Sequence, residues 1–96
     1  MSNLATIAYR QKEFELAERR MREALASYEA ALSPDHTDVA YASIKLGQLL
    51  SGMGDGDAAK PELERGIAIL EKQSTPNAAW LEVARSELEE IAWRVD

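Results

Sequence analysis

The amino-acid sequence predicts an all-α protein, built as a solenoid of antiparallel helix hairpins. Apolar residues recur three and four positions apart along most of the chain, which is helical spacing. No segment alternates apolar and polar residues over several positions, as a half-buried strand does. The chain also overlays itself after a shift of 42 residues, and a period of roughly 20–50 residues is typical of a solenoid. With 96 residues, 46% of them hydrophobic, we expect one domain over 1–96.

Five helices are expected along the chain. The first has Leu4, Ile7 and Ala8 on one face and fades near Lys12. The first and second helices are expected to pack antiparallel, because the connection between them is short. The second helix has a longer apolar stripe, which consists of Phe14, Ala17, Met21, Ala24, Leu25, Tyr28 and Leu32.

Turn-forming residues separate the remaining helices. Pro34 and its neighbours end the second helix, and the glycines within 52–56 end the third. Asp57 is the predicted N-cap of the fourth helix, and Thr75 caps a fifth helix that starts at Pro76. The apolar stripes of these three helices are Val39, Ala42, Leu46, Leu49, Leu50 and Met53; Ala59, Leu63, Ile67 and Leu70; and Leu81, Ala84, Leu88, Ile91 and Ala92.

The 42-residue shift brings both the stripes and the turns into register. Leu4 becomes equivalent to Leu46 and Leu88, and the turn at 33–35 becomes equivalent to the turn at 75–77. We therefore divide the chain into repeat one (1–34), repeat two (35–75) and a terminal helix (76–96). The alternative is a five-helix bundle in which this overlap arises by chance.

Several short segments follow the pattern of a known family. They are Asn3-Leu4-Ala5, Phe14-Glu15-Leu16-Ala17-Glu18, Ala24-Leu25 and the turn Pro34-Asp35-His36-Thr37-Asp38-Val39-Ala40. In these segments the chain resembles tetratricopeptide repeats, specifically the 42-residue kind found in kinesin light chains. The resemblance implies a right-handed α-solenoid whose first helices line a concave groove that binds a peptide or partner domain. Lys12, Gly56 and Gly66 depart from the pattern, so a looser second hairpin is expected.

Other segments match a second pattern, namely Val39-Ala40, Lys45-Leu46-Gly47, Ile67-Ala68-Ile69 and the acidic run Ser86-Glu87-Leu88-Glu89-Glu90. Here the chain resembles the carboxy-terminal helical domain of SET-and-MYND lysine methyltransferases. This resemblance implies an alternative function, in which the chain is a helical segment that packs on the catalytic domain of a larger enzyme.

Residues that could perform chemistry are sparse. The chain has no cysteine and one histidine, which rules out a cysteine zinc site and a multi-histidine metal site. Gly52 to Asp57 superficially resembles a phosphate loop, but it follows a helix and contains two carboxylates. His36 is interpreted as a helix-entry residue rather than part of a catalytic dyad. We expect no catalytic residue, metal or cofactor, and therefore no enzyme activity of this chain by itself.

The candidate partner-binding site is the inner face of the first helix of each hairpin. Tyr41, Lys45 and Gln48 share a stripe about 120° from the apolar stripe of their helix. Tyrosine, tryptophan and arginine often anchor protein interfaces, although a solvated face without function is the alternative. Trp80 and Trp93 are expected to cover an end of the stack or to face a further helix, rather than to grip a ligand. The predicted groove consists of Thr6, Tyr9, Arg10, Tyr41, Lys45, Gln48, Val83, Glu87, Glu90, Trp93 and Arg94.

The charge of the chain limits the class of partner. Eleven basic and seventeen acidic residues give a net charge of −6, whereas nucleic acids and anionic membranes attract clustered positive charge. We expect a protein or peptide partner, no nucleic acid and no membrane. The start of the chain has no signal-peptide pattern, so a cytoplasmic location is expected. The first predicted helix lacks its opening turns, and the last has no partner to complete its hairpin. This predicts a fragment or the end of a longer array, self-association that covers an open face, or packing on a neighbouring domain.

Overall fold

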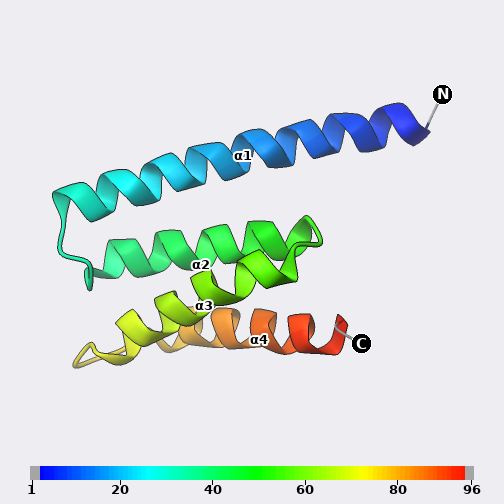
Figure 1. Cartoon of the computed structure of the whole chain (residues 1–96). Coiled ribbons are helices and arrows are strands. Elements are labelled where there is room, and N and C mark those ends of the chain that lie inside the picture. Colours follow the sequence, from blue (N-terminus) through cyan, green and yellow to red (C-terminus); the bar gives the residue numbers. More distant parts are fainter. Residues whose placement is uncertain (1–2, 95–96) are drawn as a thin grey trace.

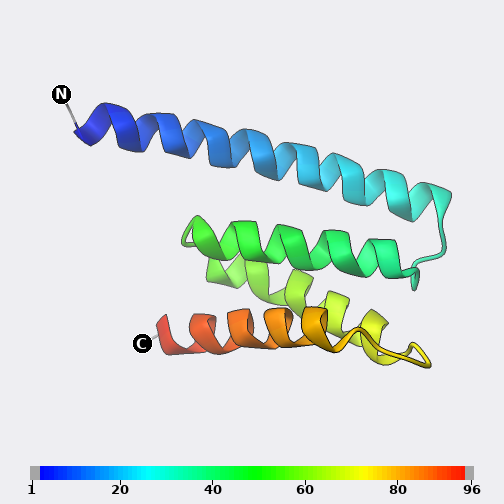
Figure 2. The ribbon, with the colours of Figure 1, turned by 180° about the vertical axis from the view of Figure 1, so that it is seen from behind.

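The computed structural model describes the backbone of residues 3–94 and the side chains of residues 12–93. The helices are α1 (Asn3–Ala31), α2 (Thr37–Gly52), α3 (Gly56–Glu71) and α4 (Ala78–Arg94), and residues 3–94 contain no strand. Helix α2 packs against α3, α1 packs against α2, and α4 packs against both α3 and α2. Figures 1 and 2 show α1 and α4 on opposite sides of the α2–α3 pair. The predicted all-α helical repeat architecture is therefore confirmed.

The expected number of helices is wrong at the amino-terminal end of the chain. The two helices predicted on either side of Lys12 form the single helix α1, which extends past the end of α2 (Figure 1). Arg10, Gln11, Lys12 and Glu13 all have good helix propensity, and no glycine or proline interrupts them. Because Lys12 stands where the family pattern has a turn glycine, the first predicted hairpin does not form within the chain.

The core lies mainly between α2 and α3, where the two helices approach closely. A Cβ atom on Gly47 would lie 2.6 Å from Leu63 Cγ, and one on Gly66 would collide with Ile44. Helix separation depends on the side chains at the contact, so these two glycines allow the close approach. The expectation of a looser second hairpin at Gly66 is thus wrong. The most deeply buried large side chains of this interface are Val39, Ile44, Leu46, Leu50, Leu63 and Leu70.

The ends of α2 agree with the predicted turns. His36 is the N-cap of α2, and its Nδ1 accepts a hydrogen bond of 3.1 Å from the backbone N–H of Asp38. This places His36 at the entry to a helix, as its sequence context predicts. After α2, Gly54 has a φ of 85°, a conformation that glycine adopts without the steric cost of a Cβ atom.

The predicted N-caps of α3 and α4 are displaced by two residues each. Asp55, not Asp57, caps α3, because its Oδ1 accepts a hydrogen bond of 3.2 Å from the backbone N–H of Ala58. Asp57 lies in the first turn of α3. Asn77 precedes α4 and its Oδ1 accepts from a backbone N–H three residues later at 3.3 Å, so Thr75 is not the cap.

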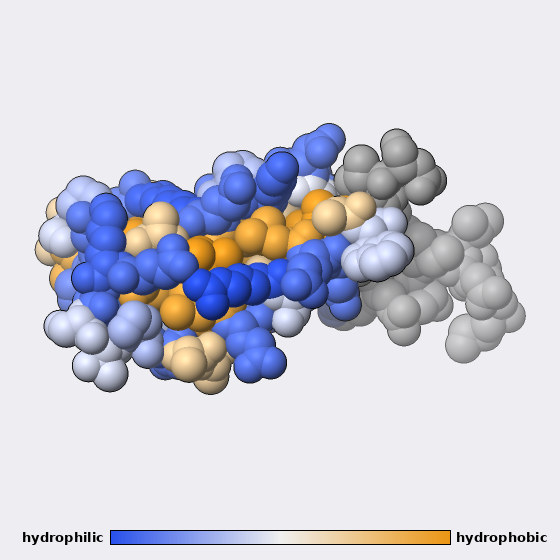
Figure 3. Space-filling model, turned by 90° about the horizontal axis from the view of Figure 1, so that it is seen from below, coloured by the Kyte–Doolittle hydropathy of each residue, from blue (hydrophilic) through white to orange (hydrophobic). Residues whose placement is uncertain are grey.

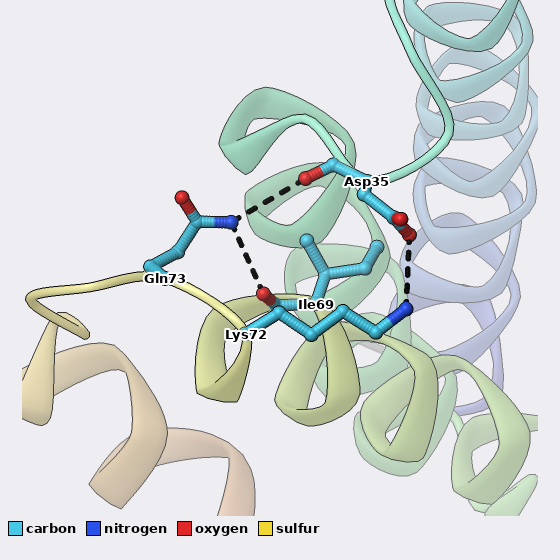
Figure 4. Close-up of polar contacts among 4 residues, drawn as sticks. All are labelled: Asp35, Ile69, Lys72 and Gln73. Atoms are coloured by element: carbon cyan, nitrogen blue, oxygen red, sulfur yellow. Dashed lines mark hydrogen bonds and ion pairs between the residues drawn. The ribbon is translucent and has the colours of Figure 1, made fainter.

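A small polar cluster joins the loop before α2 to the end of α3 (Figure 4). Lys72 Nζ lies 3.3 Å from Asp35 Oδ1. Gln73 Nε2 donates both to the backbone oxygen of Asp35, at 3.5 Å, and to that of Ile69, at 3.2 Å. These contacts hold the start of α2 beside the end of α3, which is the arrangement of an antiparallel helix pair.

Apolar surface also lies on the side of α4 that faces away from α1. Figure 3 shows an apolar strip on this face, flanked by hydrophilic side chains. Near the start of α3 and the end of α4 there is a hollow of about 460 Å³, lined by Gly56, Asp57, Lys60, Glu64, Leu88, Ile91 and Ala92. No helix within residues 3–94 combines the length and the apolar character that crossing a membrane requires.

Candidate functional site

Three side chains from two helices form a cluster on the face shared by α2 and α4. The rings of Tyr41 and Trp80 have centroids 5.1 Å apart and are tilted by 40°, a favourable aromatic geometry. Lys45 Nζ lies 5.8 Å from the centroid of the Trp80 ring, within the range of a cation–π contact. Both rings are half-buried, whereas Lys45 is exposed. We refer to Tyr41, Lys45 and Trp80 as the aromatic cluster.

Two hollows border the aromatic cluster. The smaller one, about 140 Å³, is lined by Gln48, Ala79, Trp80 and Val83, and we call it the Trp80 hollow. The larger one, about 250 Å³, lies between α1 and α2, and we call it the α1–α2 groove. Its lining residues are Met21, Ala24, Tyr28, Asp38, Tyr41, Ala42 and Lys45.

The structure brings together four of the residues predicted for the groove. Tyr41 and Lys45 belong to the aromatic cluster, and Gln48 and Val83 line the adjoining Trp80 hollow. They come from α2 and α4, which are the first helices of successive predicted hairpins. The sequence stripe on α2 therefore corresponds to one continuous surface with the first half of α4.

The other predicted groove residues do not join this cluster in the described structure. Glu87 is half-buried and Glu90 is exposed, both further along α4 than Val83. Trp93 is 86% exposed. The side chains of the remaining four lie outside the described residues, so their assignment stays a prediction; they are Thr6, Tyr9, Arg10 and Arg94.

Trp80 is the functional candidate that the sequence interpretation missed. It was expected at an end of the stack, yet its ring packs against Tyr41 of the preceding hairpin. Trp80 lies three residues before Val83, so extending the predicted stripe by one helical turn would have included it. Helix α4 begins at Ala78, so Trp80 lies in its first turn.

The site offers binding groups rather than reactive ones. Two aromatic rings, an ammonium group and the Gln48 amide surround a small apolar hollow. Among the side chains that the structure describes, no three His, Asp or Glu residues converge where they could hold a metal ion. Pockets lined by apolar groups with a few polar ones are typical of recognition sites.

Comparison with known proteins connects this arrangement to a family. A family model described as tetratricopeptide repeat matches residues 1–72, which is most of the chain. The chain belongs to the tetratricopeptide repeat family. Such repeats generally mediate protein–protein interactions, and domains built from them are typically non-catalytic scaffolds. No significant match was found among the curated proteins or among the solved structures.

The matched residues end at the end of α3. Within them, α2 and α3 form one complete antiparallel pair of the tetratricopeptide kind. Helix α4 lies beyond the matched residues, and it supplies Trp80 and Val83 to the site. The candidate site therefore combines a helix of a matched repeat with the helix that follows it.

Proposed function

We propose that the α2–α4 face binds a segment of a partner protein, with one apolar side chain of that segment in the Trp80 hollow. The observation that supports this function is the position of Trp80, held against Tyr41 and Lys45 beside an open hollow. Membership of a family that generally mediates protein–protein interaction supports the same class of function. The chain has no catalytic role of its own in this proposal.

The size of the Trp80 hollow favours a side chain over a small-molecule ligand. Its volume of about 140 Å³ is well below the roughly 300–1,000 Å³ of pockets that enclose drug-sized ligands. Trp80 and Tyr41 are already packed against each other, so binding would order few side chains. A low ordering cost is a general source of affinity in interfaces.

The charges around the hollow suggest the polarity of the bound segment. Lys45 lies on the α2 side, whereas Glu87 lies one helical turn beyond Val83 on α4. An acidic residue of the partner would face Lys45 and a basic residue would face Glu87. Such complementary charges contribute mainly to specificity and association rate. We therefore propose a partner segment with an acidic group, an apolar anchor and a basic group, in this order from α2 to α4.

The proposal is tested with peptides selected on the wild-type chain from a random display library. Trp80→Ala should weaken binding of the selected peptides about 30-fold, because central aromatic residues often contribute 2 kcal/mol or more. Trp93→Ala is the matched control, since Trp93 is 86% exposed and lies outside the cluster, and it should change the affinity less than about threefold. Equal losses in the two variants would contradict the proposal, as would a failure to select any peptide.

A second variant separates binding from folding. Trp80 also packs against the core, so its removal lowers stability as well as affinity. Lys45→Ala changes an exposed side chain and should leave the helical circular dichroism unchanged. It should weaken the binding of peptides with an acidic residue by several-fold, and it should leave their neutral analogues unaffected. Loss of binding to both kinds of peptide would show that the proposed polarity is wrong.

We also propose that the repeats are of the 42-residue kind found in kinesin light chains, with the predicted boundaries 1–34, 35–75 and 76–96. The capping position of His36 and the pairing of α2 with α3 support this assignment. The alternative, a helical segment of a SET-and-MYND methyltransferase, stays a prediction. It would be favoured if the chain bound an isolated catalytic domain of that class and the Trp80→Ala and Lys45→Ala variants bound it equally well. The cytoplasmic location likewise stays a prediction.

A further inference from the structure

One face of α1 is only partly covered although the equivalent face of α3 is buried. Under the 42-residue shift, Met21 corresponds to Leu63 and Tyr28 to Leu70. Leu63 and Leu70 are 0% and 1% exposed, because α2 covers them. Tyr28 is 41% exposed and Met21 is half-buried, and both line the open α1–α2 groove. The groove is thus the place on α1 that a preceding helix would cover, as α2 covers α3.

The segment whose sequence fits the Met21 end of this groove is residues 3–11. It is equivalent to the part of α2 that contains Leu46, Gly47 and Leu50, and it has Leu4, Ala5 and Ala8 at those positions. In α2, Leu46 and Leu50 are buried, and Gly47 approaches Leu63 and Ala59 of α3. By equivalence, Ala5 belongs opposite Met21 and Ala17. The family match begins at residue 1 and so includes this segment in the repeat pattern.

The same segment of the same chain does not reach the groove. Helix α1 continues from Asn3 to Ala31 without interruption. At a rise of 1.5 Å per residue, Ala5 lies about 24 Å from Met21 along the helix axis. A straight helix in place of a turn separates two parts of the sequence that are suited to pack together. Exchange of identical elements between two copies is a low-cost way to let these two parts pack together.

We propose that two copies of this chain exchange their amino-terminal segments, so that residues 3–11 of each pack along the first half of the other copy's α1 and cover the Met21 end of its α1–α2 groove. The two α1 helices then lie side by side and antiparallel. Ala5 of one copy then lies opposite Ala17 and Met21 of the other copy. In an antiparallel pair of identical helices, the two-fold axis passes midway between paired positions, which here is between residues 11 and 13. The two-fold axis therefore passes near Lys12, and each copy makes the same contacts with the other, as a closed dimer requires.

This exchange also extends the predicted inner groove. The exchanged segment contains Thr6, Tyr9 and Arg10, which the sequence assigns to the same inner stripe as Tyr41 and Lys45. The second copy would thus supply the first third of that surface next to α2. The exchange itself is inferred from the burial of α1 and α3 and does not depend on peptide binding at the Trp80 hollow.

Disulfide cross-linking tests the exchange directly, because the chain has no cysteine of its own. The full chain with Ala5→Cys and Met21→Cys is oxidised and run on a non-reducing gel. We expect a covalent dimer, which returns to monomer on reduction. A monomer with an internal disulfide would show that the segment folds back onto its own chain, and it would overturn the proposal. Two free thiols would overturn it as well, because the groove would then be empty or filled by something else.

A matched pair of cysteines controls for random collision. Glu23 is exposed and lies about 200° around α1 from Met21. Ala5→Cys with Glu23→Cys should therefore give much less covalent dimer than Ala5→Cys with Met21→Cys. Equal yields from the two pairs would contradict the proposed contact.

The part of α1 at Lys12 and Glu13, which we call the hinge, offers a second test that needs no cysteine. The helix would have to bend there for residues 3–11 to fold back onto their own chain. Light scattering of the wild-type chain should show a dimer whose population increases with protein concentration. Lys12→Gly combined with Glu13→Gly should weaken α1 at the hinge and let the segment fold back. We expect the dimer dissociation constant to rise at least tenfold while the helical circular dichroism is retained. A wild-type chain that stays monomeric over the micromolar range would overturn the proposal, as would an unchanged constant in the variant.

Discussion

The close contact between α2 and α3 at Gly47 predicts that adding a single methyl group there destabilises the fold. In Gly47→Ala the new Cβ atom would lie 2.6 and 2.7 Å from Leu63 Cγ and Cδ2, and 3.3 Å from the backbone oxygen of Ala59. Leu63 is completely buried, so its branched end has no free space to move into. The helices must separate or Leu63 must leave its rotamer.

The expected magnitude follows from two opposing effects. Alanine is better than glycine inside a helix by about 1 kcal/mol. Extra methyl groups in a packed interface typically cost about 1–3 kcal/mol. Gly52→Ala provides the matched control, because Gly52 also lies in α2 but has nothing within 4 Å of a Cβ atom. Both variants gain from helix propensity, the control somewhat less because Gly52 is the last residue of α2, and only Gly47→Ala has the clash. We therefore expect the free energies of unfolding of the two variants to differ by about 1–3 kcal/mol, with Gly47→Ala the less stable.

The assay is thermal unfolding followed by circular dichroism at one fixed protein concentration. A difference of 1 kcal/mol corresponds to roughly 4–8 °C in Tm for a domain of this size. Gly47→Ala should therefore melt at least about 4 °C below Gly52→Ala. The reasoning would be refuted if Gly47→Ala melted at the same temperature as Gly52→Ala or above it, because α2 and α3 would then not be in close contact at this position.

Three further substitutions test the helix ends and the surface, each by urea unfolding. Asp55→Ala should cost about 1 kcal/mol through loss of the α3 N-cap, and it should cost more than Asp57→Ala. Gly54→Ala should cost about 1–2 kcal/mol, because a φ of 85° is strained for alanine. Arg85→Ala removes a half-exposed ion pair with Glu71 and should change stability by less than about 1 kcal/mol. Equal losses of stability in Asp55→Ala and Asp57→Ala would contradict the assignment of Asp55 as the cap. A larger loss in Arg85→Ala than in Gly54→Ala would contradict the expectation that backbone strain outweighs an exposed ion pair.

The core of the repeat could be predicted from the sequence because burial follows periodicity. Leu46, Leu63 and Leu70 lie on apolar stripes at helical spacing, and all three are almost completely buried. The turn at Gly54 could be predicted because only glycine adopts its backbone conformation without strain. In both cases one local physical constraint determines the result.

The continuous α1 was missed because two signals disagree there. The 42-residue register demands a turn near Lys12, but the local helix propensity of residues 10–13 opposes it. The prediction follows the 42-residue register and places a turn near Lys12, whereas in the structure the helix propensity of residues 10–13 keeps α1 continuous. The N-cap of α3 was misassigned because aspartate is a good capping residue at either position 55 or position 57. Which of the two is the cap depends on where the first turn of α3 begins.

The α2 half of the candidate site could be predicted, and the α4 half only in part. Tyr41, Lys45 and Gln48 follow one another on a single helix, so helical geometry alone aligns them. The pairing of Tyr41 with Trp80 depends on how far α4 is displaced along α2, which a repeat shift gives only to within a helical turn. Val83 was assigned correctly to this surface, but the aromatic residue one turn earlier was not.

Nuclear magnetic resonance of the indole N–H groups tests most directly whether the aromatic cluster is a binding site. The chain has two tryptophans and should give two indole signals, which Trp93→Phe assigns. During titration with a selected peptide, the Trp80 signal should shift and saturate while the Trp93 signal stays in place. A peptide that binds tightly and shifts only the Trp93 signal, or neither signal, would show that recognition takes place elsewhere on the molecule.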